Sequence, residues 1–101
     1  MASYAHQSIE YIKKLIHIQQ HIPPRYLRND QKTIQDCIKK LKPLVENNHY
    51  SDNQARLFWI EKRWMIRVLI PSTHYPGFAK LISEFSELDE TEVWNSVTSN
   101  L

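Results

Sequence analysis

Residues 52–70, DNQARLFWIEKRWMIRVLI, decide the fold of this chain. Their apolar side chains point to nearly every side of a helix axis, which is typical of a helix that is buried among others. Ser51, followed three residues later by Gln54, has the form of a capping box and predicts a helix start at about Asp52. We therefore expect a central helix at about 52–70.

The same stretch leaves one alternative open, an α+β fold with a β-hairpin at 56–70. Its aromatic and β-branched residues favour strands. However, the apolar residues do not alternate cleanly, and the would-be turn Glu61-Lys62-Arg63 lacks the Gly, Asn or Asp of tight hairpin turns. The lack of alternation and the lack of a turn residue both favour the helix over the hairpin.

Apolar residues keep helical spacing on both sides of the central stretch. Pro23 and Pro24 end the first of these runs, because proline lacks the amide proton that a helix needs. The expected helices run from about Ser8 or slightly earlier to Ile22, from Asn29 or Asp30 through Val45 with a kink or restart at Pro43, over 78–88, and from Asp89 to Leu101. The sequence thus predicts one all-α domain over residues 1–101, a compact bundle of four to five helices.

Gly77 is the only glycine among the 101 residues. Phosphate-binding loops, dinucleotide fingerprints and nucleophile elbows need several closely spaced glycines, so these classes of site are excluded. Gly77 follows Tyr75 and Pro76, between the central helix and the acidic C-terminal part. We expect a tight turn or hinge there.

The histidines and the cysteine do not assemble a catalytic or metal site. His17 and His21 share a helix face, but Ile18 stands where a zinc protease has its general base, and neighbouring lysines oppose a metal cation. Cys37 is the single cysteine, which excludes an internal disulfide and a cysteine-based zinc cluster. We expect no enzyme activity, no metal and no cofactor.

A row of arginines on the central helix is the more specific feature. Arg56, Arg63 and Arg67 are spaced to lie along one stripe, with Trp59 beside it. Arginine and tryptophan dominate binding hot spots, so these four residues are the candidate protein-binding surface. If it is not a binding surface, the arginine stripe is expected to contact the acidic stretch 84–92. This contact would be either a clamp within the chain or an interface between two chains of a homodimer.

A second hypothesis comes from the uneven charge of the chain. Residues 1–80 hold all thirteen Lys and Arg with six acidic residues, whereas 81–101 hold five acidic residues and no base. A basic segment from Arg25 to Lys42 would suit nucleic acid, because lysines neutralise phosphates and a tyrosine stacks on a base. The candidate nucleic-acid contacts are Arg25, Tyr26, Arg28, Lys32, Lys39 and Lys40.

Taken together, these patterns favour a non-enzymatic helical protein that binds another protein. An adaptor and an inhibitor, immunity or phage-type accessory protein that occupies a partner's surface both fit, and nucleic-acid binding is the alternative. The first residues lack the basic and apolar regions of a secretory signal, and no apolar run approaches the length of a membrane span. We therefore expect a cytoplasmic protein.

Overall fold

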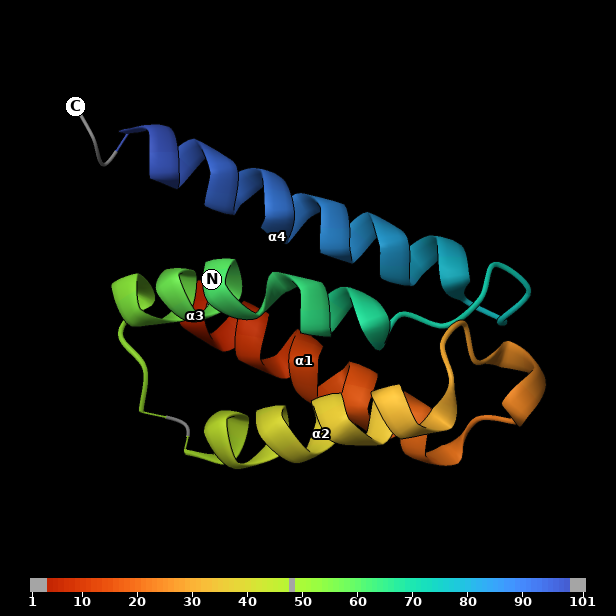
Figure 1. The fold of residues 1–101 in the computed structure, drawn as a ribbon. Helices are drawn as coiled ribbons and strands as arrows, with labels where there is room; N and C mark the ends of the chain where they lie inside the picture. The colour runs from red at the N-terminus through yellow and green to blue at the C-terminus, as the bar shows by residue number, and fades with distance from the viewer. Residues whose placement is uncertain (1–3, 48, 99–101) are drawn as a thin grey trace.

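Four α-helices and one 3₁₀ turn make up the fold (Figure 1). The computed structural model describes residues 4–47 and 49–98, and it describes side chains for 5–47 and 49–91. The elements are α1 Tyr4–His21, η1 Pro24–Tyr26, α2 Gln31–Glu46, α3 Asp52–Val68 and α4 Phe78–Thr98. No strand occurs within these ranges, so the predicted all-α bundle is confirmed and the hairpin alternative at 56–70 is wrong.

Successive helices run in opposite directions, and α1 and α3 form the centre of the bundle (Figure 1). α4 covers this central pair on one side and α2 covers it on the other. The core consists of aliphatic and aromatic side chains from all four helices. Its fully buried members include Ile12, Leu15, Leu41, Trp59 and Ile66.

The start of α3 follows the predicted capping box. The Ser51 hydroxyl accepts a hydrogen bond from the Gln54 backbone N–H at 3.2 Å, and the Gln54 side chain accepts one from the Ser51 N–H at 2.9 Å. Two backbone donors that a helix start leaves unpaired are thereby satisfied. Asp52, the first residue of α3, also accepts a hydrogen bond from the Ala5 N–H and so joins the starts of α1 and α3.

The end of α3 is held by side chains from elsewhere in the chain. Asn29 donates to the Val68 carbonyl at 3.2 Å, and Arg28 donates to the Arg67 carbonyl at 2.9 Å. From α1, the buried Gln19 amide donates to the Leu69 carbonyl. Many helices end in a glycine that adopts a left-handed conformation. Here three side chains satisfy the terminal carbonyls instead.

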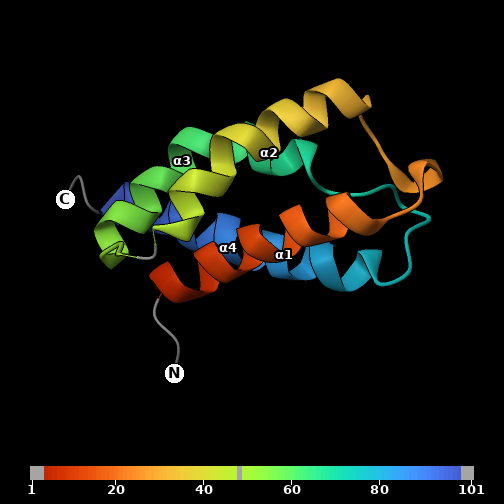
Figure 2. The same cartoon turned by 90° about the horizontal axis from the view of Figure 1, so that it is seen from below.

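The connections 22–30 and 69–77 lie together at one end of the bundle (Figure 2). The Ser72 N–H donates to the Tyr26 carbonyl at 2.8 Å, and the rings of Tyr26 and Tyr75 meet edge to face at 5.7 Å. These contacts join the two proline-containing loops into one cap on that end.

α2 begins where the sequence indicated and is continuous through its proline. Asp30 is the N-cap, and hydrogen bonds from the Thr33 backbone and side chain hold the pKa of its carboxyl below the usual range. Pro43 lies in the last turn and is exposed, and the helix continues to Glu46 without a restart.

The predicted break before Asp89 is wrong, because α4 is one helix from Phe78 to Thr98. A helix start was expected at Asp89, but its carboxylate is turned toward α3 and ion-pairs with Arg67. The Thr91 hydroxyl donates to the Glu87 carbonyl, an interaction typical of a helix interior. Without Gly or Pro at this point, nothing interrupts the backbone. Residues 99–101 of the expected last helix lie outside the described residues.

Gly77 forms the predicted turn just before α4, with a φ of 85°. That left-handed conformation is costly for residues with a side chain. A Cβ added to Gly77 would have no atom within 4 Å, so backbone conformation alone sets the requirement for glycine.

Gln19→Leu tests the side-chain cap of α3. The change leaves the buried Leu69 carbonyl without its donor, and we expect a loss of about 1–2 kcal/mol in the free energy of unfolding in urea. This loss lies in the lower half of the range for an unpaired buried polar group. The substitution also removes the Gln19 Oε1, which has no hydrogen-bond partner among the described atoms, and this partly offsets the loss. Gln20→Leu, at the neighbouring exposed position, is the control and should change stability little. Equal effects of the two variants would contradict the role assigned to Gln19.

Gly77→Ala tests the turn. We expect a loss of about 1 kcal/mol in the free energy of unfolding, since alanine resists a positive φ. Gly77→Asn should cost less than Gly77→Ala, because asparagine tolerates the left-handed region better. The reverse order, measured by urea denaturation of both variants, would show that backbone conformation is not what requires glycine.

Candidate functional site

The outer side of α3 exposes large apolar side chains. Leu57 and Trp64 are each 59% exposed and Ile60 is 38% exposed. Their spacing of three and four residues places them on one face of the helix, opposite the buried Trp59 and Ile66. We call Leu57, Ile60 and Trp64 the α3 outer face. Each is a type of side chain that a folded protein usually buries.

Trp59, one of the four predicted protein-binding residues, does not lie on the surface. It is fully buried, and its ring packs at 6.1 Å from Tyr11 and 5.7 Å from Phe85. The expectation that Trp59 flanks an exposed stripe is therefore corrected. Trp59 fills the space between α1, α3 and α4, and it is Trp64 that presents an indole to solvent.

Arg63 and Arg67 meet the acidic stretch inside the chain. Arg63 Nη1 lies 3.6 Å from Asp89 Oδ1, and Arg67 Nη2 lies 3.1 Å from Asp89 Oδ2. The Arg67 guanidinium also stands over the Phe85 ring, 5.2 Å from its centre. Of the two arrangements considered for the stripe, the structure contains the intramolecular clamp between α3 and α4.

Arg56 lies nearer the start of α3, away from the Asp89 clamp. Its guanidinium donates to the Asn53 side chain at 3.4 Å, one turn earlier on the same helix. Arg56 is partly exposed and borders the α3 outer face. Arg56 thus has a hydrogen-bond partner on its own helix, whereas Arg63 and Arg67 contact Asp89 of α4.

Part of the predicted nucleic-acid segment is used inside the fold. Arg28 caps the end of α3. Arg25 stands over the ring of Tyr26, 4.8 Å from its centre, and Tyr26 in turn packs against Tyr75. Tyr26 is half-buried, so its ring does not lie open for stacking on a base.

The three predicted lysine contacts are exposed on α2 but do not share one side of it. Lys32 and Lys39 are seven residues apart and lie along the same edge, whereas helical geometry places Lys40 on another. Asp36 stands between them in the sequence. The nucleic-acid hypothesis stays a prediction.

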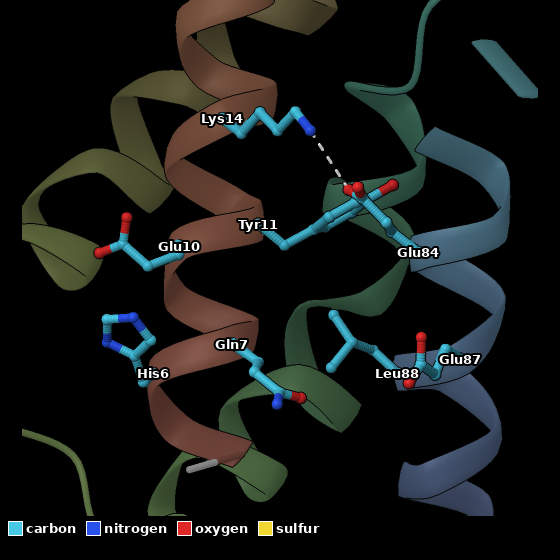
Figure 3. Close-up of a pocket in the computed structure, with 8 residues that line it drawn as sticks. All are labelled: His6, Gln7, Glu10, Tyr11, Lys14, Glu84, Glu87 and Leu88. Atoms are coloured by element: carbon cyan, nitrogen blue, oxygen red, sulfur yellow. Dashed lines mark hydrogen bonds and ion pairs between the residues drawn. The ribbon is translucent and has the colours of Figure 1, made fainter. Parts of the chain in front are cut away.

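A shallow pocket of about 380 Å³ lies between α1 and α4 (Figure 3). Tyr11 and Leu88 contribute apolar surface, and Lys14 spans toward Glu84, with 3.3 Å between Nζ and Oε2. The Tyr11 hydroxyl donates to the Leu81 carbonyl at 2.7 Å. Burial, with the Glu84 carboxylate nearby, raises the pKa of Tyr11 well above its usual value. The hydroxyl therefore ties α1 to α4 and stays protonated.

The remaining residues that were considered for chemistry are His17, His21 and Cys37. The rings of His17 and His21 lie 4.6 Å apart on exposed α1 surface. In the described part of the chain, no three His, Cys, Asp or Glu residues gather as a metal site would require. Cys37 is buried in the core, and burial raises the pKa of its thiol, which disfavours the reactive thiolate.

Sequence reasoning missed the α3 outer face. Because the central helix is apolar nearly all round, the sequence did not indicate which side the other helices leave uncovered. The signal available was the spacing of Leu57, Ile60 and Trp64, which places them opposite Ala55, Trp59 and Ile66. Choosing between these two sides requires knowing where α1 packs.

A double-mutant cycle measures the clamp between α3 and α4. The Arg67 and Asp89 side chains are partly exposed, so the coupling free energy between Arg67→Met and Asp89→Asn should be about 0.2–1 kcal/mol. The cycle of Arg63→Met with Asp89→Asn is the matched comparison, and its longer 3.6 Å contact should give the smaller coupling. A coupling above about 2 kcal/mol, from urea denaturation, would instead make the clamp a principal source of stability.

None of the helices, within the residues that the structure describes, is long and apolar enough to cross a membrane. Comparison of the chain with models of protein families, with curated proteins and with solved structures found no match.

Proposed function

We propose that this protein is a non-enzymatic binding module whose α3 outer face occupies the surface of another protein chain. The observation that carries the proposal is the exposure of Leu57, Ile60 and Trp64 together on one helix face. Single exposed apolar residues are common, but a contiguous set that includes a tryptophan marks a site of association. The partly exposed Arg56 and Glu61 supply a polar border for such a surface.

The revised surface differs from the predicted one in its centre. Trp64 replaces Trp59 as the aromatic anchor, since Trp64 is exposed and Trp59 is fully buried. Arg63 and Arg67 stabilise the contact with α4 and lie beside the surface. A module of this kind acts by covering a partner, as an adaptor or an inhibitor does, and its single buried cysteine suits a reducing cytoplasm.

Site-specific photo-crosslinking tests the proposal. A photoreactive phenylalanine analogue in place of Ile60 should form covalent adducts with a protein chain in an extract of the cells that make this protein. The same analogue at Gln35, an exposed position on α2, is the control and should form none. Trp64→Ala in the Ile60 crosslinking variant should reduce adduct yield by about tenfold, the effect of removing a hot-spot side chain. Equal adducts at positions 60 and 35 would contradict the proposal.

A further inference from the structure

The pocket between α1 and α4, which we call the α1–α4 pocket, has no role in the proposed function. Its lining residues belong to α1 and α4, so it is separate from the α3 outer face. Tyr11 and Leu88 line it with apolar surface, and they point toward each other from the two helices (Figure 3). His6 and Glu10 point away from α4 in the same view. The pocket is therefore a groove whose apolar part lies between the two helices.

The charge along this groove is negative. Three of its lining residues are glutamates, namely Glu10, Glu84 and Glu87. Glu84 ion-pairs with Lys14 at 3.3 Å, and Glu10 ion-pairs with Lys13 at 3.6 Å. Glu87 is exposed and has no ion pair within the described part of the chain. One carboxylate beside the apolar surface of the groove is therefore not neutralised.

The negative charge continues from the groove along the exposed side of α4. Glu90 follows Glu87 by three residues, which places it on the next turn of the same side. Glu90 is also exposed and also lacks an ion pair among the described residues. The sequence contains no Lys or Arg after Lys80, so α4 itself supplies no base near these two carboxylates. A ligand that complements this surface carries positive charge at more than one point.

We infer that the α1–α4 pocket binds a basic segment of a partner protein, with one arginine of that segment lying over Tyr11 and Leu88 and its guanidinium against Glu87. This inference goes beyond the proposed function and does not depend on it, because a different surface is involved. An arginine suits the groove because its alkyl stem packs on apolar surface while its planar donors match a carboxylate. Phosphate groups of nucleic acids or lipids are disfavoured, since like charges repel.

A small organic cation is a poorer occupant than a peptide segment. Sites for small ligands usually enclose most of the ligand, whereas this pocket is shallow. The uncompensated charge also extends beyond the pocket to Glu90. A peptide with several basic residues contacts both the pocket and the adjoining side of α4.

An NMR titration of the nitrogen-15-labelled protein tests the inference. The probe is an unlabelled hexapeptide of alternating glycine and arginine, capped at both ends. At low ionic strength we expect saturable binding with a Kd of about 100 μM, and amide shift changes concentrated in residues 7–14 and 81–90. The same peptide with citrulline, a neutral analogue of arginine, should bind at least tenfold more weakly. Equal binding of the two peptides, or shift changes concentrated on α2 or α3, would overturn the inference.

Two substitutions move the affinity in opposite directions. Glu87→Gln removes the unpaired carboxylate and should weaken binding of the arginine peptide about fivefold. Lys14→Met removes the opposing cation and releases the Glu84 carboxylate, so it should strengthen binding about threefold. A folded Lys14→Met variant that binds the peptide more weakly than the wild type would overturn the inference.

Glu61→Gln and Lys39→Met are the matched controls, because they make the same changes of net charge at exposed positions on α3 and α2. Both should leave the affinity nearly unchanged, and circular dichroism should show the same helix content in all four variants. If Glu61→Gln weakens binding as much as Glu87→Gln does, the peptide responds to net charge alone and the inference is wrong. Agmatine, a single guanidinium on a short alkyl chain, should bind at least tenfold more weakly than the arginine peptide. Equal binding would make the occupant a small cation and overturn the assignment of a peptide segment.

Discussion

The end of α3 is the constraint on which the rest of the structure depends. A helix leaves its last carbonyls without partners, and burying them unpaired is costly. In this chain α3 lies at the centre, and no glycine follows it to close the helix in the usual way. Gln19, Asn29 and Arg28 supply the missing donors. These hydrogen bonds join α1, and the loop that leads into α2, to the end of α3.

Several of the arginines make contacts within the fold. Arg28 satisfies a carbonyl of α3, Arg25 stacks on Tyr26, and Arg63 and Arg67 share the Asp89 carboxylate. A guanidinium suits all three tasks because it combines planar donors with a face that stacks on aromatic rings. The surplus of basic residues in the first part of the chain therefore serves partly to close helix ends and to join α3 to α4.

Local signals in the sequence predicted what local interactions determine. The Ser51–Gln54 capping box, the Asp30 cap and the turn at Gly77 each depend on a few neighbouring residues, and each was found where it was expected. Two features could not be predicted because they depend on packing partners distant in sequence. The sequence at Asp89 resembles a helix start, but in the structure the Asp89 carboxylate pairs with Arg67 of α3. Trp59 and Trp64 are the same type of residue on the same helix, so the sequence alone does not indicate which one is buried. The packing of α1 and α4 against Trp59 decides this.

The apolar pattern of the central helix also carries the argument for binding. A helix that is apolar on nearly every side is expected to be covered on nearly every side. Within the chain, α1, α2 and α4 cover three of the sides of α3, and Leu57, Ile60 and Trp64 remain on the fourth. Residues 52–70 therefore carry large apolar side chains that remain exposed in the described part of the chain. In the proposed function, the surface of a partner chain covers this side of α3, so the stretch that decides the fold also supplies the proposed binding surface.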